Sequence, residues 1–543
     1  MRANSCRVGT DEGVRLMTIE LTPRRMTILT LILVIIGGAA GALFGKSTIS
    51  DDERALIERA SRITTELLEW LPEDTLPSDV VYDGINGMLE VLDPHSNFLD
   101  PHSYQKMRER QEGSFFGVGI IISRRNSQLT VIAPMAGTPA SQKGLRAGDV
   151  IVGVDGEDTT EISVDEVVDM IRGPEGTPVV LTIRRPGMAE TFDVEIVRAR
   201  IPTNSVRYAF MIRPDVGYIR LGEFSNTSNR EVKTALAELE KEGMEKLIFD
   251  LRNNPGGSLD AAIGVSDVFL TKGQLIVSTK GRTKDSTTRI EAPGHGPGFQ
   301  GPVVILVNEG SASASEIVAG AVQDHDRGIV LGDTTWGKGL VQTVFGVRDG
   351  GLALTTARYY TPSGRCIQRD YESFIDYITH RNGNGDDVEE REVYETDAGR
   401  TVLGGGGITP DVTVTNRELS APIVRLYGNS AFFRYGVELL KDVPESDQQA
   451  FGETFDPSHG ALEGFLQWVE HEEILNEEAL HALQENPLAM GDISRALTIE
   501  ILNATSGLES GYRHALEADD QFRQAIDHLE DAADLWEALG GGK

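Results

Sequence analysis

Three serines stand at every second position in GSASASE (310–316), between the apolar run VVILV and the helix-like run IVAGAVQD. A serine hydroxyl is a weak nucleophile until a neighbouring base removes its proton. Serines in such a place also cap helices and bond turn backbone without doing any chemistry. The stretch therefore indicates either a nucleophile or a structural turn, and the choice depends on a base within reach.

The candidate bases are two histidines and a lysine. His325 follows the helix-like run, so at 1.5 Å per residue it lies roughly 15 Å from Ser313. His295 lies in GHGPG, a glycine-proline loop that gives its side chain no fixed position. Lys338 stands between two glycines in TWGKGLVQT (335–343), and burial there would lower its pKa towards that of a general base. The alternative is a glycine turn with an exposed lysine.

Acyl transfer also needs hydrogen-bond donors aimed at the developing oxyanion. The segment DLRNNPGGSL (250–259) ends an expected strand with a glycine-rich turn that opens a helix. Such a turn exposes backbone amides where a helix N-terminus favours negative charge. A phosphate would suit the same turn, but no Gly-Lys-Ser/Thr follows to complete a nucleotide-binding loop.

Taken together, these segments resemble the carboxyl-terminal processing peptidases, also called tail-specific proteases. The segments YYTPSGRCIQ (359–368) and GGGGITPDV (404–412) match the same family, and the resemblance runs from about 51 to 415. In the family the nucleophile lies 25 residues before the catalytic lysine, which selects Ser313 and Lys338. The resemblance implies that Gln342 orients the lysine and that the amides of Ala314 and Gly257 form the oxyanion hole. We then expect Ser311 to bond turn backbone, and Ser315 and Glu316 to begin the following helix.

Residues 113–200 resemble a PDZ domain of the type these proteases carry. FFGVGI (115–120) matches the carboxylate-binding loop, and GTPASQKGLRAGDVIVGVDG (137–156) matches the strongest PDZ signature. The resemblance implies that the amides of Gly117, Val118, Gly119 and Ile120 hold a peptide carboxylate, while the peptide adds as a strand to the sheet edge. It also implies that Arg172, in IRGPEG, is a regulatory sensor that contacts the protease core.

The chain is predicted to be an α+β multidomain protein. Apolar periodicity predicts helices in 51–112. Strands dominate 113–200, the first of them expected over SFFGVGIIIS (114–123), and alternating strands and helices in 201–415 indicate an α/β domain. The resemblance implies a superhelical, crotonase-like form for that protease core. Residues 416–543 form a helical extension that matches nothing familiar. Its role as a cover for the cleft, a partner-binding surface or an assembly element stays open.

The run MTILTLILVIIGGAAGALFG (26–45) is long enough to cross a bilayer as a helix. Arg24 and Arg25 precede it, so the positive-inside rule leaves residues 1–25 in the cytoplasm and the catalytic region outside, in the periplasm. Ala40-Gly41-Ala42 also fits a cleavable signal peptide. We favour a single-pass anchor in the cell membrane over a signal peptide, and both over a buried core helix.

The chain's formal net charge of −33 argues against nucleic-acid binding. Residues 431–543 hold 24 acidic and 6 basic side chains, which favours solvated helical faces there. The two cysteines, Cys6 and Cys366, fall on opposite sides of the predicted anchor and cannot pair. Neither has the neighbours of a zinc site, so we expect no metal and no cofactor.

The sequence thus predicts a serine endopeptidase that cleaves proteins near their carboxyl termini through a Ser-Lys dyad, with a PDZ domain that recognises or gates the substrate tail. The implied partners are proteins with exposed carboxyl termini, a second copy of the chain bound through 51–112, and an adaptor protein. The alternatives are a catalytically silent PDZ scaffold at the membrane and an acyl-CoA enzyme on a related core. The last leaves Lys338 and the PDZ segment unexplained.

Overall fold

The computed structural model describes residues 50–73, 75–125, 127–295, 298–370, 391–458, 460–538 and 540. The chain divides into two compact units, Met1–Gly84 and Ile85–Lys543. The predicted cytoplasmic segment 1–25 and the predicted anchor 26–45 lie outside the described residues. Within the described ranges, no helix has the length and apolar character needed to cross a membrane.

The first unit contains α2 (Asp51–Glu69) and most of α3 (Pro77–Leu89). A capping box between Ser50 and Glu53 starts α2 by satisfying two amides at the helix end. The residues Leu56, Ala60, Ile63 and Leu67 of α2 follow one another at spacings of four and three, which places them on one face. The large side chains of this stripe are exposed.

A six-stranded sheet forms the centre of the second unit. Its order is β10-β11-β12-β15-β16-β21; β10 runs antiparallel to β11 and the other neighbours are parallel. The strands are β10 (Val206–Arg213), β11 (Val216–Leu221), β12 (Lys246–Asp250), β15 (Val303–Val307), β16 (Ile329–Gly332) and β21 (Val412–Thr413). Because parallel strands are covered on both faces, they read as continuous apolar runs such as VVILV.

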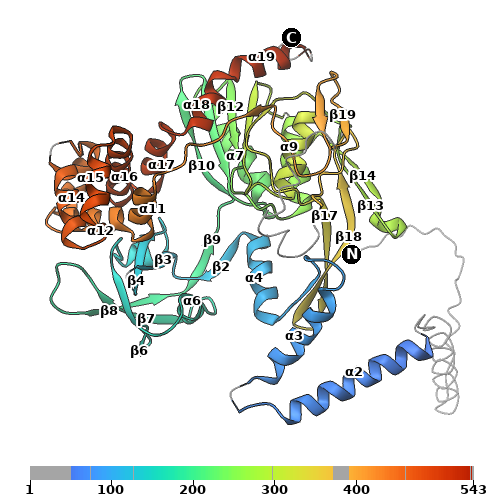
Figure 1. Cartoon of the computed structure of the whole chain (residues 1–543), viewed down its shortest axis with the longest axis horizontal. Coiled ribbons are helices and arrows are strands. Elements are labelled where there is room, and N and C mark those ends of the chain that lie inside the picture. The colour runs from blue at the N-terminus through green and yellow to red at the C-terminus, as the bar shows by residue number, and fades with distance from the viewer. Residues whose placement is uncertain are drawn as a thin grey trace, which may run out of the picture. The chain divides into compact units, whose positions relative to one another are not determined.

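Helices from two distant parts of the chain cover the two faces of this sheet (Figure 1). One face packs against α7 (Ser228–Lys241), α8 (Leu259–Phe269) and α9 (Ala314–Asp324), and the other against α17 (Leu508–Leu516), α18 (Asp520–Asp527) and α19 (Leu529–Ala538). In β11, Ile219 and Leu221 face the first group while Val216 and Tyr218 face the second. The end of the acidic extension is therefore part of the same packed core as the central sheet.

The remainder of the extension has an apolar core of its own, built from α11–α16. These helices are α11 (Ala421–Gly428), α12 (Ala431–Leu440), α13 (Glu445–Glu453), α14 (Ala461–His471), α15 (Glu477–Gln484) and α16 (Pro487–Thr505). They contact the β-rich segment, since Arg125 hydrogen-bonds Ser430 and Val437 packs against Gly148. The predicted division of the chain at 415/416 stays a prediction, but the packing crosses it.

A second, mainly antiparallel sheet carries the lysine segment. It has the order β1-β18-β13-β14, with β17 paired to β18. Its strands are β1 (Asn97–Leu99), β13 (Leu275–Gly281), β14 (Thr288–Glu291), β17 (Leu340–Val347) and β18 (Gly350–Tyr360), and a small hairpin joins β19 (Val393–Glu395) to β20 (Thr401–Leu403). Because β1 comes from the segment predicted as the N-terminal helical region, residues after 84 of that region join the core.

The β-rich segment forms a sheet of order β3-β4-β5-β7-β8, with β6 beside β5. It comprises β3 (Ile120–Arg125), β4 (Gln128–Pro134), β5 (Val150–Val154), β6 (Glu157–Asp158), β7 (Pro178–Arg184), β8 (Phe192–Val197), α5 (Pro139–Gln142) and α6 (Val164–Ile171). The sequence predicted one strand over 114–123, and this is wrong. The extended conformation is interrupted at Gly119, whose φ is +80°. As a result β2 (Ser114–Gly117) pairs with β9 (Ala199–Pro202), and β3 pairs with β4.

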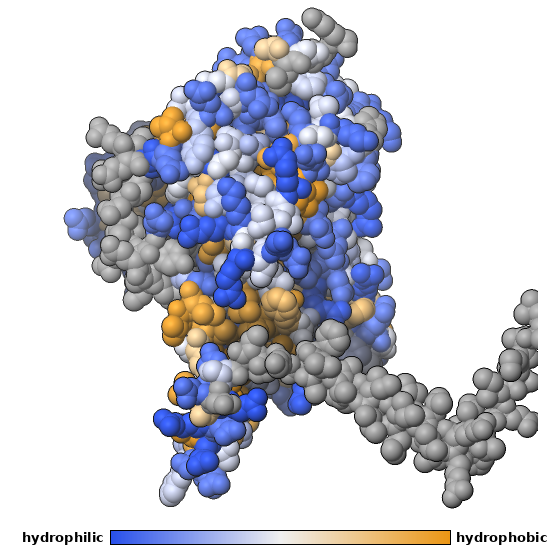
Figure 2. Space-filling view, turned by 90° about the vertical axis from the view of Figure 1, so that its right-hand side faces the viewer, coloured by the Kyte–Doolittle hydropathy of each residue, from blue (hydrophilic) through white to orange (hydrophobic). Residues whose placement is uncertain are grey.

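On the face shown in Figure 2 most side chains are hydrophilic, and apolar side chains gather in one large patch and several smaller ones. Exposed large apolar side chains of the described residues include Val91 and Leu92 after α3, and Phe345 and Val347 on β17. Such gathered apolar surface is typical of contacts with other protein segments.

Candidate active site

The three serines of GSASASE lie at the sharp turn between β15 and α9, here called the serine elbow (Ser311–Ser315). Ser311 and Ser315 are fully buried. The Ser311 hydroxyl donates to the carbonyl of Leu251, and the Ser315 hydroxyl donates to the carbonyl of Asn254, both at 2.9 Å. The prediction that Ser311 bonds turn backbone is confirmed. Ser313 alone of the three is partly exposed.

The backbone of Ser313 adopts a conformation that L-residues rarely use. Its φ is 55° and its ψ is −108°, at the N-cap of α9. Such strain persists where the surroundings over-determine it, and it clusters at functional sites. The Ser313 side chain is hydrogen-bonded to Tyr359, a buried residue of β18, and burial raises the pKa of Tyr359 to about 12. The sequence placed Tyr359 at the start of the family segment YYTPSGRCIQ but gave it no role.

Lys338 lies just before β17 and is largely buried. Burial lowers the pKa of Lys338, against the opposing charges of Glu316 and Asp93. Its ammonium donates to the Gln342 side-chain oxygen at 2.9 Å, and the Gln342 amide donates to the His95 carbonyl at 2.6 Å. The amide group of Gln342 thus bridges the lysine to a loop that lies 247 residues earlier in the chain.

Glu316 joins the serine elbow to the lysine segment. Its Oε2 accepts the backbone amides of Ser313 at 2.7 Å and Lys338 at 2.9 Å. Its Oε1 accepts the Gly337 amide at 2.7 Å and the Thr335 hydroxyl at 2.6 Å. Burial raises the pKa of Glu316, but all four partners donate, so the carboxylate is the form that fits them. The prediction that Glu316 lies in the first turn of the helix is confirmed, but the sequence did not predict this bridging role.

The glycine turn of DLRNNPGG lies directly against the elbow. A Cβ atom on Gly256, whose φ is +95°, would stand 2.9 Å from the Ala314 nitrogen, so only glycine allows this approach. Gly257 forms a bridge with Phe224, in which the Gly256 carbonyl and the Ser258 amide bond to Phe224. Ala314 is the first residue of α9, and its amide has no partner inside the helix. The two predicted oxyanion donors therefore belong to adjoining turns.

The loop Asp93–Ser96 was not singled out by the sequence. The Asp93 carboxylate accepts the His95 and Ser96 amides, the Ser96 hydroxyl and the Thr355 hydroxyl of β18. Burial would raise the pKa of Asp93, but these hydrogen bonds hold it below its usual value. Burial and the nearby Lys338 charge lower the pKa of His95 to about 4. The loop thereby fixes the carbonyl that holds Gln342.

The two histidines considered as bases are placed elsewhere. His325 ends the eleven-residue helix α9; its Nδ1 lies 2.7 Å from Asp397 and its Nε2 lies 2.8 Å from the Leu275 carbonyl. His295 is exposed and stands 3.8 Å from Asp267. Both ring nitrogens of His325 are already engaged at the far end of the helix from Ser313.

The predicted carboxylate-binding residues lie where an edge strand begins. Gly117 ends β2, Ile120 starts β3, and the carbonyls of Val118 and Gly119 accept the amides of Ala140 and Met135. Strand β3 stands at the end of the sheet order, so one side of it is free of sheet partners.

Arg172 follows α6 near this loop. Its guanidinium bonds Glu109 of α4 (Pro101–Glu112) at 2.8 Å and lies over the Phe115 ring at 4.4 Å. Arg172 therefore contacts the helix α4 and the ring of Phe115, and its regulatory role stays a prediction.

Comparison with known proteins gives two family matches. Residues 215–373 match peptidase family S41, and residues 130–185 match the PDZ domain. A carboxy-terminal-processing protease of Bartonella bacilliformis is 42% identical over 301 residues, 54% of this chain and 69% of that protein. A carboxyl-terminal-processing protease of Synechocystis is 39% identical over 297 residues, 53% of this chain and 68% of that protein.

Among solved structures, the photosystem II D1 C-terminal processing protease is 31% identical and matches 65% of this chain and 86% of that chain. Its TM-score of 0.34 is too low to support an argument from the fold. The chain belongs to the carboxyl-terminal processing serine proteases of peptidase family S41, and it carries a PDZ domain.

Proposed function

We propose that this protease cleaves proteins at or near their carboxyl termini through a Ser313–Lys338 dyad. One observation carries the proposal: a single carboxylate, Glu316, accepts the backbone amides of both residues. It brings a partly exposed serine with a strained backbone next to a lysine whose pKa is lowered by burial. A silent PDZ scaffold would need neither feature.

In the proposed reaction, neutral Lys338 takes the proton of the Ser313 hydroxyl as the oxygen attacks the scissile carbonyl carbon. The oxyanion that forms accepts hydrogen bonds from the amides of Ala314 and Gly257. Lys338 then returns the proton to the leaving amine, and water repeats the sequence on the acyl-enzyme. Gln342 orients the ammonium or amine without adding charge.

The PDZ domain is proposed to receive the substrate tail. A carboxyl-terminal peptide would add as a strand along the free side of β3, with its carboxylate on the amides of residues 117–120. Because Arg172 touches Phe115 at this loop and Glu109 on α4, occupation of the loop would act on an ion pair between the PDZ domain and α4.

The location and assembly remain proposals. We propose a single-pass membrane protein, anchored by residues 26–45 with the catalytic region in the periplasm. We also propose a homodimer through the exposed stripe Leu56, Ala60, Ile63 and Leu67 of α2, because its alternating spacing of four and three suits helix pairing. An adaptor protein and a superhelical, crotonase-like description of the core stay predictions.

Cleavage of an unfolded protein with an apolar carboxyl terminus tests the proposed activity. Wild type and Ser313→Ala are incubated with this substrate and with a matched substrate whose terminus is amidated, and the fragments are identified by mass spectrometry. We expect cuts near the free terminus by wild type, slower cutting of the amidated form, and none by Ser313→Ala. Cutting by Ser313→Ala at the wild-type rate would overturn the dyad.

Light scattering tests the dimer. A Leu56→Glu, Leu67→Glu double variant places charges on the stripe, whereas Glu58→Gln changes an exposed residue off it. We expect the first to lower the measured mass to that of one chain and the second to leave it unchanged. An unchanged mass for both would remove this proposal.

A further inference from the structure

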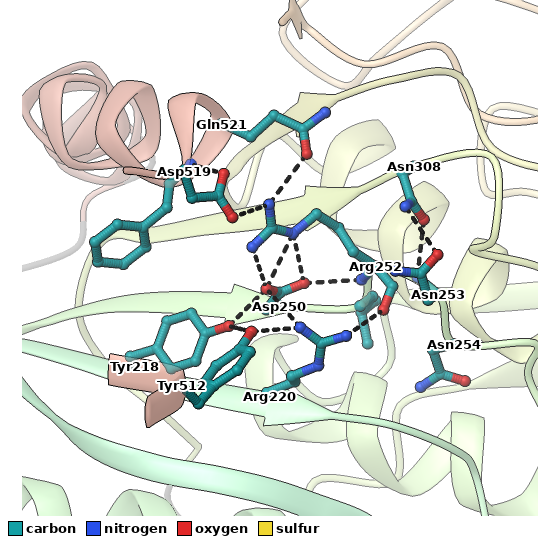
Figure 3. A network of polar contacts seen from close by, with 12 residues as sticks. Tyr218, Arg220, Asp250, Arg252, Asn253, Asn254, Asn308, Tyr512, Asp519 and Gln521 are labelled. Atoms are coloured by element: carbon teal, nitrogen blue, oxygen red, sulfur yellow. Dashed lines mark hydrogen bonds and ion pairs between the residues drawn. The ribbon is translucent and has the colours of Figure 1, made fainter. Parts of the chain in front are cut away.

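A buried ionic network joins the C-terminal extension to the glycine turn beside the serine elbow (Figure 3). At its centre is Arg252, the third residue of DLRNNPGG, only 6% exposed. Its Nη2 bonds Asp250 at 2.6 Å, and its Nε lies 3.0 and 3.1 Å from the two Asp250 oxygens. Its Nη1 bonds the Asp519 carboxylate at 2.6 Å and the Gln521 side-chain oxygen at 3.1 Å.

The partners on the extension are held rigidly. Asp519 is the N-cap of α18, where its other oxygen accepts the Phe522 amide at 3.0 Å. Gln521 is fully buried, and its amide group donates to Asp333 and to the Val414 carbonyl. Asp519 therefore faces Arg252 from a fixed helix end.

Asp519 is the carboxylate that pairs with Nη1 of Arg252. Asp250 is fully buried and receives Arg252; Arg220 lies 3.9 Å away and also bonds the Tyr512 hydroxyl of the extension. Burial would raise the pKa of Asp250, but the charge of Arg252 holds it below the usual value. The guanidinium groups of Arg220 and Arg252 thus face the carboxylates of Asp250 and Asp519, and the charge of Arg252 also acts on Asp333. Without Asp519 the Arg252 guanidinium, only 6% exposed, loses a directly bonded counter-charge, which is costly for a buried group.

The residues that flank Arg252 accept hydrogen bonds from the serine elbow. The Leu251 carbonyl accepts the Ser311 hydroxyl, and the Asn254 carbonyl accepts the Ala312 amide at 3.0 Å and the Ser315 hydroxyl. Asp250 sits in the central strand β12 and cannot easily shift, whereas residues 252–256 form a turn. A displaced Arg252 would therefore move the turn and the elbow with it.

We propose that Asp519 is a positioning residue for catalysis, which acts through Arg252 to hold the 250–257 turn and the serine elbow in register. The inference rests on the proposed role of Ser313. It makes the end of the acidic extension a working part of the active site, although the family match ends at residue 373.

The test compares two neighbouring charge removals in the full-length chain. Asp519→Asn keeps the helix cap, because asparagine caps as well as aspartate, but it turns an amide towards Arg252. Asp520→Asn removes the same charge one residue later, where the carboxylate is exposed and pairs with Arg523. We expect kcat to fall about tenfold for Asp519→Asn with KM within about twofold, since misplacing a reacting group costs turnover rather than binding. Asp520→Asn should stay within about twofold of wild type in both constants.

A double-mutant cycle with Arg252→Met tests the route of the effect. Asp519→Asn should cost little further kcat in the Arg252→Met background, because the partner through which it acts is gone. Thermal unfolding and binding of an apolar-tailed peptide to the PDZ domain are measured for each variant, so that a loss of fold is recognised. If Arg252→Met does not fold, the comparison of kcat between Asp519→Asn and Asp520→Asn decides the test by itself.

Equal kcat for Asp519→Asn and Asp520→Asn would overturn the inference, as would the same loss with and without Arg252. Ser313→Ala is assayed in parallel. If Ser313→Ala is inactive while Asp519→Asn turns over at the wild-type rate, this inference fails and the dyad stands; if Ser313→Ala is active, the dyad itself fails.

Discussion

The two halves of the candidate site are held in different ways. The serine elbow is fixed by backbone carbonyls of the neighbouring turn, which accept from Ser311, Ala312 and Ser315. The lysine is oriented by a relay of side-chain groups that ends at the His95 carbonyl, in a loop far outside the segment matched to the S41 family. The geometry of the proposed nucleophile thus depends on the central sheet and its turns, whereas the proposed base depends on a loop from the N-terminal side.

The largest expected effect is the loss of the nucleophile itself. Ser313→Ala should lower kcat by about 10⁴-fold or more, because the remaining binding and oxyanion groups supply only a small part of the rate enhancement. Stability, followed by thermal unfolding, should fall by only about 1 kcal/mol, since the Ser313 side chain contacts only Tyr359 and the first turn of α9. Substantial turnover by this variant would show that the elbow's partly exposed serine is not the reacting group.

Loss of the base should be nearly as severe. Lys338→Arg should lower kcat/KM by about 10³-fold, because a guanidinium stays protonated at any working pH. The wild-type kcat/KM should rise with pH through the pKa of Lys338, since only the neutral amine accepts the proton and burial lowers that pKa. Rates are measured from pH 6 to 10, with His325→Ala as the control. Near wild-type rates for the arginine variant, or loss of activity in folded His325→Ala, would contradict the assignment.

The next largest effect is expected from Glu316, which bridges the serine elbow and the lysine segment. Glu316→Gln should lower kcat by about 100-fold, because an amide nitrogen would face two N–H donors and separate the elbow from the lysine segment. Glu316 raises the pKa of Lys338 through its charge. In the variant that pKa should fall, so the residual activity should begin at lower pH. If the rise of kcat/KM with pH lies at the same pH in the variant as in wild type, Glu316 carries no charge at the working pH.

A smaller effect is expected from the loop that serves the base alone. Asp93→Asn should lower kcat/KM about tenfold, because asparagine loses one of the acceptors that fix the His95 carbonyl. It should also move the acid limb to lower pH, since Asp93 raises the pKa of Lys338. The chain supplies a matched control: DPHS recurs at 100–103, where Asp100 caps α4 in the same manner. Equal kinetic effects of Asp93→Asn and Asp100→Asn would remove the loop's special role.

The smallest effects should come from the two outer serines. Ser311→Ala and Ser315→Ala each remove a buried hydrogen bond, which costs about 1–3 kcal/mol of stability. Turnover should stay within a few-fold of wild type, because the other contacts between the elbow and the turn remain. Chemical denaturation and kcat are measured together. A loss of turnover in either variant equal to that of Ser313→Ala would mean that the elbow cannot be divided into one reacting and two supporting serines.

Much of the site followed from local sequence. The VVILV run lies in the segment of alternating strands and helices, and it forms β15, which is covered on both faces. DLRNNPGGSL predicted a strand that ends in a glycine turn opening a helix, and this turn lies between β12 and α8. One local prediction failed at Gly119, because alternation in SFFGVGIIIS continues across a glycine that lets the chain leave one sheet and enter another.

The sequence by itself determined which chemical groups are the candidates, through its resemblance to a family, and which elements carry them, because the patterns of strands, helices and glycine turns depend on neighbouring residues. Only the tertiary structure decided that Glu316 bridges Ser313 and Lys338, that the Asp93 loop holds Gln342, and that Asp519 reaches Arg252. Two of these contacts join residues more than 240 positions apart, and the third depends on how two turns meet. No periodicity records such pairings, because they arise when packed layers bring distant polar groups together in an interior that leaves them no water to bond instead.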